Sequence, residues 1–379
     1  PSTFFEELGF NYIGPIDGHD VNGLVNTIKN MSHLKGPQLL HVITTKGKGY
    51  QAAEQDPIKY HAVPKFNPLD TNLPKKIASL PSYSQIFGDW LCKTAEADKK
   101  LVGVTPAMAE GSGMVEFSKR FPDQYFDVAI AEQHAVTYAA GLAIGGLKPV
   151  VAIYSSFLQR GYDQLIHDIA IQNLPIMFAV DRAGIVGADG ATHAGIFDLS
   201  FLRCIPNITI IAPSSSLEMY KALNFANHFE GPVCVRFPRG KSEIVEFVSS
   251  STIELGKGNI VKTGKDTAIF AFGNMLEIAL EASEKINATV VDMRFVKPLD
   301  KALIIEIANN SKVLISIEDN TVNGGAGSAI NELLQENNIN TPLKILGVPD
   351  KVTEHGSQSE LYELYGLTSE NIINVSKNK

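Results

Sequence analysis

A single carboxylate, that of Glu132, stands between two stretches of contrasting composition. The residues before it, 125–130, predict a β-strand. Three alanines and a glycine between positions 135 and 141 predict a helix that neighbouring segments can approach closely. One interpretation is a glutamate in the first turn of a helix, where the helix dipole favours it. The other is an acid that shares a proton with a ring nitrogen of a bound heterocycle. The pattern alone leaves both interpretations open.

Three arginines and a histidine follow other predicted strands, at the sheet edge where open α/β folds bind their ligands. Arg160, Arg182 and Arg239 come shortly after the ends of such strands. Guanidinium groups placed there could pair with a carboxylate or with a phosphate ester. His193 follows a glycine-rich loop and could transfer a proton. Each arginine could equally be a surface ion-pair partner, and the histidine could cap a turn.

Longer strings carry more information than these single residues. They lie at 10–19, 45–50, 59–66, 106–113, 127–134, 154–160, 181–193 and 292–300. Together they span nearly the whole chain, which resembles the 1-deoxy-D-xylulose-5-phosphate synthases, a thiamin diphosphate-dependent family of the transketolase superfamily. The resemblance implies the condensation of pyruvate with D-glyceraldehyde 3-phosphate and release of CO₂, for isoprenoid and thiamin biosynthesis. It also implies a cytoplasmic homodimer.

The resemblance assigns a role to each candidate residue. Taken individually, Phe157 and Tyr50 would more often be ordinary aromatic residues of the core. Glu132 would be the acid on the aminopyrimidine ring, and Phe157 would stack on that ring. The implied catalytic residues are Glu132, His61, His193 and Asp189, the implied cofactor-binding residues are Tyr50, Glu132 and Phe157, and the implied substrate-binding residues are Tyr154, Arg160, Arg182 and Arg239.

The metal site of the family is not apparent in the sequence. The resemblance implies Mg²⁺ held by a Gly-Asp-Gly motif and a later Asn, oxygen ligands that suit this ion. The nearest string, at 187–190, falls at the wrong place in the strand order. We therefore assign no metal ligand here, expect the ligands in an N-terminal segment of the same protein, and expect the chain alone to be inactive. A site formed by His134, His167 and His193 is the alternative, without paired spacing to favour it.

Composition limits the other classes of function. The 379 residues suffice for two to three domains. A net charge of −8 argues against nucleic acid or an anionic membrane as the main partner. No apolar run approaches the roughly 20 residues of a membrane span. The three cysteines are scattered, which is typical of a reducing cytoplasm.

Alternating strands and helices predict an α/β fold. We expect a terminal βαβ piece of a first α/β domain at 1–50, a linker at 51–80, a pyrimidine-binding α/β domain at 81–245 and a transketolase C-terminal α/β domain at 256–379. Residues 318–327 are expected to form a loop whose glycines could bind an anion and which serves dimer packing.

Two alternative functions remain. A β-subunit of a 2-oxo acid dehydrogenase also pairs a glutamate-bearing pyrimidine domain with a C-terminal domain, but it would lack the βαβ piece and the string at 154–160. A non-catalytic interaction module is the other alternative.

Overall fold

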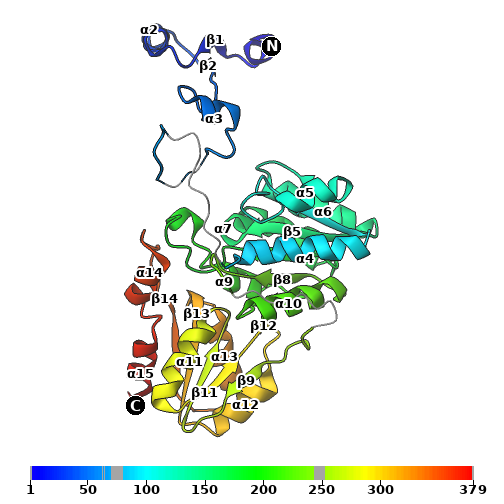
Figure 1. Ribbon diagram of the computed structural model, residues 1–379, viewed down its shortest axis with the longest axis vertical. Helices are drawn as coiled ribbons and strands as arrows, with labels where there is room; N and C mark the ends of the chain where they lie inside the picture. The colour runs from blue at the N-terminus through cyan, green and yellow to red at the C-terminus, as the bar shows by residue number, and fades with distance from the viewer. Residues whose placement is uncertain (1, 62, 64, 70–79, 243–251, 378–379) are drawn as a thin grey trace. The chain divides into compact units, whose positions relative to one another are not determined.

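The computed structural model describes residues 2–61, 63, 65–69, 80–242 and 252–377. It divides into two compact units, Pro1–Ser79 and Leu80–Lys379 (Figure 1). The predicted α/β class is confirmed in both units. The predicted domain end at residue 245 and most of the second half of the predicted linker lie outside the described residues.

The first unit contains the predicted βαβ piece. Strands β1 (Asn11–Asp17) and β2 (Gln38–Ile43) are parallel and are joined by α2 (Val21–Met31). Asp20 starts α2, because its carboxylate accepts a hydrogen bond from the Gly23 amide at 3.0 Å. The unit also contains helices α1 (Ser2–Glu7) and α3 (Gln51–Gln55), and α3 lies within the segment that the sequence predicted to be a linker.

The second unit begins with a seven-stranded sheet of order β12-β7-β8-β6-β5-β3-β4. All its strand pairs are parallel except β12 with β7. Continuous apolar runs form its central strands, as expected for strands buried on both faces. The strands are β3 (Leu101–Thr105), β4 (Tyr125–Asp127), β5 (Lys148–Tyr154), β6 (Met177–Asp181), β7 (Thr209–Ile211), β8 (Val233–Arg236) and β12 (Phe295–Lys297).

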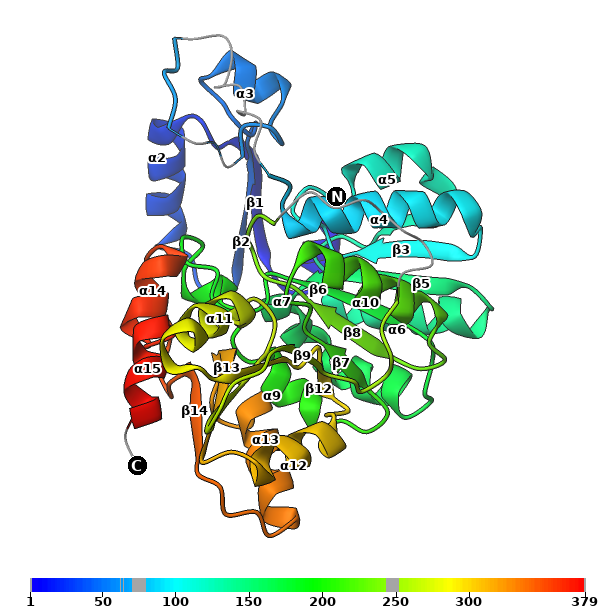
Figure 2. The same ribbon diagram turned by 60° about the horizontal axis from the view of Figure 1, so that its bottom comes forward.

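Helices cover both faces of this sheet (Figure 2). Alternate residues of a strand point to opposite faces. Val150 and Ala152 of β5 therefore join one core with α4 (Tyr83–Ala97) and α10 (Ser216–His228). Val151 and Ile153 join the other core, under the small-residue helix α6. The remaining helices here are α5 (Val115–Arg120), η1 (Pro122–Gln124), α6 (Glu132–Ile144), α7 (Ser155–Leu158), η2 (Gln159–Gly161), α8 (Tyr162–Gln164), η3 (Leu165–Ala170), η4 (Ala191–His193) and α9 (Asp198–Arg203).

A second sheet, of order β14-β13-β10-β11-β9, follows in the chain. It is parallel except for its edge strand β9. Its strands are β9 (Asn259–Lys262), β10 (Thr267–Ala271), β11 (Thr289–Asp292), β13 (Val313–Thr321) and β14 (Leu343–Val348). Its helices are α11 (Met275–Ile286), α12 (Lys301–Asn309), α13 (Ala326–Glu336), α14 (Gln358–Leu364) and α15 (Ser369–Lys377).

The prediction of a loop at 318–327 is wrong for residues 318–321, which belong to strand β13. Glu318, Asp319 and Asn320 continue strand β13 and are fully buried. The predicted anion site is filled by the chain itself, since the amides of Ala326 and Gly327 donate to the Glu318 carboxylate at 2.7 and 2.8 Å. Burial raises the pKa of Glu318 to about 8, although these donors and Arg236 act in the opposite direction.

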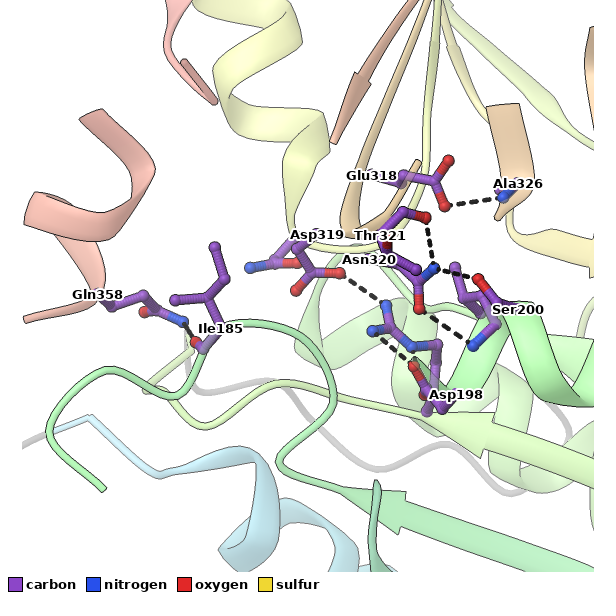
Figure 3. A network of polar contacts seen from close by, with 12 residues as sticks. Ile185, Asp198, Ser200, Glu318, Asp319, Asn320, Thr321, Ala326 and Gln358 are labelled. Carbon is purple, nitrogen blue, oxygen red and sulfur yellow. Dashed lines mark hydrogen bonds and ion pairs between the residues drawn. The ribbon is translucent and has the colours of Figure 1, made fainter. Parts of the chain in front are cut away.

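The two sheets meet at a buried arginine, Arg236, at the end of β8. Its guanidinium donates to Asp198 at 2.8 Å and to Asp319 at 2.7 Å, and all three side chains are at most 3% exposed. Figure 3 shows Asp198 and Asp319 approaching from the two sides of this junction. Burial alone would lower the pKa of Arg236, but the two carboxylates hold it above its ordinary value. The arginine therefore stays charged and joins the sheets.

Replacing Arg236 by Met should destabilise the second unit strongly. The variant Arg236→Met leaves two buried carboxylates without their counter-ion, a change that typically costs about 3–5 kcal/mol. Urea unfolding of the chain, followed by far-UV circular dichroism, measures the loss. Lys312→Met is the matched control, because Lys312 forms an exposed pair with Asp266 and such pairs contribute about 1 kcal/mol or less. Equal losses in the two variants would contradict a central role for Arg236.

Candidate active site

Glu132 is positioned by a sharp break at the end of β4. The predicted strand at 125–130 ends early, at Asp127, because Ala129 adopts a left-handed conformation with φ of 58°. The Asp127 carboxylate stabilises this turn by accepting from the amides of Ala107 and Ala129, both at 2.9 Å. The chain then enters α6 with Glu132 as its first residue, 3% exposed. A nearly buried carboxylate therefore stands at a helix N-terminus.

The Glu132 carboxylate has one charged partner among the described residues. Arg160 donates from Nη1 to Oε1 at 3.1 Å, while its own side chain remains 56% exposed. This approach needs Gly161, since a Cβ there would lie 2.8 Å from a methyl of Val136 in α6. The missing side chain of Gly161 therefore lets the segment with Arg160 lie against the first turn of α6, which contains Glu132.

Aromatic rings continue from this pair along the carboxyl end of β5. Tyr154 and Phe157 stack with their centroids 5.4 Å apart, and His193 meets the edge of Phe157 at 5.3 Å. The Arg160 guanidinium lies 5.7 Å from the Phe157 centroid. Burial raises the pKa of Tyr154 to about 12, so this hydroxyl keeps its proton at neutral pH.

Two of the predicted substrate arginines share a single acid. Asp189 accepts from Arg182 and, at 2.9 Å, from Arg239. The Arg182 guanidinium also covers the Tyr154 ring, 4.3 Å from its centroid. Arg182 has a positive φ of 55°, which turns its side chain back over the strand end. The positive charges are thus partly neutralised within the chain, and an anionic ligand would compete with Asp189.

Eight of the ten predicted site residues form one continuous series of contacts. It runs from Glu132 through Arg160, Phe157, Tyr154 and Arg182 to Asp189 and Arg239, with His193 on Phe157. The other two lie in the first unit. There the Tyr50 ring is 5.5 Å from Tyr60, and His61 is exposed.

Sequence reasoning missed two residues that support this series. Asp181, the last residue of β6, is buried, accepts from Ser84 at 2.7 Å and from the Arg182 amide at 2.6 Å, and has its pKa raised to about 6 by burial. Gly111 lies under Tyr154, where a Cβ would be 1.9 Å from the hydroxyl. Asp181 and Gly111 lie within two of the family-like segments, 181–193 and 106–113. The position of Asp181 at the end of a predicted strand could have indicated its role.

No cluster of three or more His, Cys, Asp or Glu suited to a metal ion occurs in the described parts of the chain. His167 pairs with the neighbouring Asp168 at 2.8 Å, and His134 lies beside Tyr138. A three-histidine site is therefore not formed by the described residues. The same residues include no helix long and apolar enough to cross a membrane.

The chain matches known families and known structures. Three family models match: the transketolase pyrimidine-binding domain at 80–243, the transketolase C-terminal domain at 256–372 and 1-deoxy-D-xylulose-5-phosphate synthase at 1–44. A solved structure described as a split gene transketolase, inactive β4 tetramer, is 31% identical, and the match covers 97% of that chain and 78% of this one, with a TM-score of 0.70. The chain belongs to the transketolase family.

Several relatives of high sequence identity are 1-deoxy-D-xylulose-5-phosphate synthases. A 1-deoxy-D-xylulose-5-phosphate synthase of Colwellia psychrerythraea is 66% identical over 98% of this chain and 61% of its own length. The chain thus spans about three fifths of that relative's length. A transketolase structure from Campylobacter jejuni, 17% identical with a TM-score of 0.67, covers all of this chain and 69% of its own, and shows the fold alone.

Neutralising Asp189 should strengthen anion binding by the arginine pair. In Asp189→Asn, Arg182 and Arg239 lose their shared counter-ion, so an anion no longer has to displace it. An ion-pair contribution near 1 kcal/mol predicts inorganic phosphate binding about 5-fold tighter than in the wild type. Isothermal titration calorimetry with phosphate measures the change, and Asp163→Asn, at an exposed acid of the same unit, is the control. Unchanged or weaker phosphate affinity in Asp189→Asn would refute the counter-ion role.

Proposed function

We propose that this chain is part of a 1-deoxy-D-xylulose-5-phosphate synthase, an enzyme that condenses pyruvate with D-glyceraldehyde 3-phosphate and releases CO₂. The observation that carries the proposal is the continuous series of contacts from the buried Glu132 to the arginines around Asp189. It combines a carboxylate suited to a heterocyclic cofactor with cationic groups suited to an anionic substrate. The 66% identity to a synthase supports the same reaction.

The residues present fit thiamin diphosphate. Glu132 offers a carboxyl group that is nearly buried, and Phe157 offers a half-buried ring joined to it through Arg160. When bound, the cofactor supplies a nucleophilic carbon that adds to the pyruvate carbonyl and makes the loss of CO₂ possible. Tyr50 is proposed to contribute from the first unit. The proposal includes Mg²⁺, a homodimer and a cytoplasmic location, all of which rest on the family resemblance.

The chain's own groups divide into two sets. With the cofactor bound, Glu132 would share a proton with the ring nitrogen of the pyrimidine, and Arg160 orients its carboxylate through the 3.1 Å hydrogen bond. His193, on the edge of Phe157, is proposed to give a proton to the oxygen of the carbonyl that becomes an alcohol. His61 is proposed as a further histidine of the site.

The second set is cationic and suits the phosphate of the acceptor. Arg182 and Arg239 both point their guanidinium groups at Asp189, so a phosphate can replace that carboxylate between them. Tyr154 lies under Arg182 and retains its proton as a hydrogen-bond donor. The family resemblance also assigns Arg160 to the phosphate. Because the Arg160 side chain is more than half exposed while it contacts Glu132, it remains accessible to a ligand.

The β-subunit of a 2-oxo acid dehydrogenase is the weaker proposal. Such a subunit would not include the βαβ piece, whereas residues 1–44 match the synthase model and fold as β1-α2-β2.

The full-length protein tests the proposal directly. It should form 1-deoxy-D-xylulose 5-phosphate and CO₂ from the two substrates in the presence of thiamin diphosphate and Mg²⁺. In the same protein, Glu132→Ala should reduce kcat by about 10²–10⁴-fold, because a proton-transferring group is lost. Gln133→Ala is the matched control, since Gln133 is the exposed neighbour in α6. An inactive wild type, or a Glu132→Ala variant with more than about a tenth of wild-type kcat, would refute the proposal.

Arg239→Met in the full-length protein should weaken use of the phosphorylated acceptor. Loss of a charged hydrogen bond costs about 1.5–3 kcal/mol, or roughly 10- to 150-fold in kcat/KM for D-glyceraldehyde 3-phosphate. The KM of pyruvate and the reaction with unphosphorylated glyceraldehyde should change little. Arg160→Met should in addition lower kcat with both acceptors, because Arg160 also orients the Glu132 carboxylate.

Lys241→Met is the control, because Lys241 is an exposed cation two residues away. Equal losses for both acceptors in Arg239→Met would show that this arginine does not bind the phosphate.

A further inference from the structure

The loop between β6 and α9 carries much of the candidate site. Arg182, Asp189 and His193 all lie on it, within 12 residues of one another. Yet the loop has little regular structure of its own apart from the short helix η4 and the bridge between Gly184 and Gly195. Something else must fix the positions of these three side chains.

Two side chains from beyond β14 hold the backbone of this loop. Gln358, the first residue of α14, donates from Nε2 to the Ile185 carbonyl at 2.7 Å, and Figure 3 shows it reaching across to Ile185. His355 lies with Nε2 3.1 Å from the Ala188 carbonyl, so this nitrogen carries the proton of the bond. Ala188 is the residue before Asp189.

The loop backbone is seated closely against the same segment. Gly187 has a φ of 71°, and a Cβ there would lie 2.7 Å from the Gln358 amide nitrogen and 3.0 Å from the Gly356 carbonyl oxygen. Gly184, with a φ of 77°, likewise leaves room for Asp319, whose carboxylate a Cβ would meet at 1.8 Å. Only glycine combines this conformation with this approach.

Apolar contacts hold the two ends of the loop in the core of the second sheet. Ile185 and Ile196 are buried in a cluster that includes Ile317 of β13 and Leu361 of α14. The Thr321 amide of β13 donates to the Ile196 carbonyl at 2.8 Å. These contacts and the Gln358 bond fix the two ends, whereas His355 acts on the middle of the loop, beside Asp189.

We propose that Gln358 and His355 are positioning residues for the acceptor-phosphate subsite, an inference that rests on the proposed function. By fixing the carbonyls of Ile185 and Ala188, they hold the loop backbone that carries Arg182 and so keep its guanidinium group facing that of Arg239. The segment after β14 therefore contributes to recognition of the second substrate by holding the loop backbone.

Steady-state kinetics of the full-length protein test the effect on recognition. Gln358→Met and His355→Leu remove the donors while keeping similar bulk. A neutral hydrogen bond contributes about 0.5–1.5 kcal/mol, so KM for D-glyceraldehyde 3-phosphate should rise about 3- to 10-fold in each. KM for pyruvate should stay within 2-fold, and His355→Gln, which keeps a donor, should restore the wild-type KM. Glu363→Gln, on the exposed side of α14, is the control.

Hydrogen exchange of the 379-residue chain without substrates gives a readout independent of activity. Peptides covering 183–195 should exchange faster in Gln358→Met and His355→Leu than in the wild type or Glu363→Gln, while peptides from β5 and β6 should not change. An inactive wild-type enzyme would refute the proposed function but leave this result decisive for the positioning. Unchanged exchange in the loop, or equal rises in KM for both substrates, would overturn the positioning role.

Discussion

The second unit depends on one charged interaction, the burial of Arg236 between Asp198 and Asp319. Burying one of these charged groups without its partners would cost a large desolvation free energy. The two carboxylates and the guanidinium are therefore buried together. Asp198 starts α9, Asp319 lies in β13 and Arg236 ends β8. The triad therefore sets the relative positions of both sheets at the edge where the site residues collect, which apolar packing alone would specify less strictly.

A similar balance of charge extends through the candidate site. Glu132 faces Arg160, and Asp189 faces two arginines. Each of these acids forms an ion pair with an arginine that an anionic substrate would otherwise bind. The arginine side chains are consequently ordered in advance, which reduces the conformational entropy lost when a substrate replaces the carboxylate. The cost is competition, because the substrate must displace an intramolecular partner.

The features that could be predicted from the sequence are those set by a local pattern of residues. Strands such as β5 and β6 were recognisable because both of their faces are buried, and the strand-end rule indicated Arg160, Arg182 and Arg239, which lie in one series of contacts in the structure. The pattern failed where a distant partner decides the structure. The family resemblance placed Glu318–Asn320 in a loop, whereas Arg236 and the α13 amides supply partners that let these residues continue a buried strand. The early end of β4 depends on the Asp127 side chain, which no periodicity reveals.

Strand β12 has a consequence for how such a chain can be divided. Phe295–Lys297 lies after the start of the second sheet in sequence, yet it completes the edge of the first sheet beside β7. A gene cut between residues 242 and 252 would separate β12 from its partner, expose β7 and leave a sheet edge open to aggregation. A cut near residue 80 breaks no strand pairing among the described residues. Division at the earlier junction therefore keeps the described strand pairs of both sheets intact, whereas division at the later one does not.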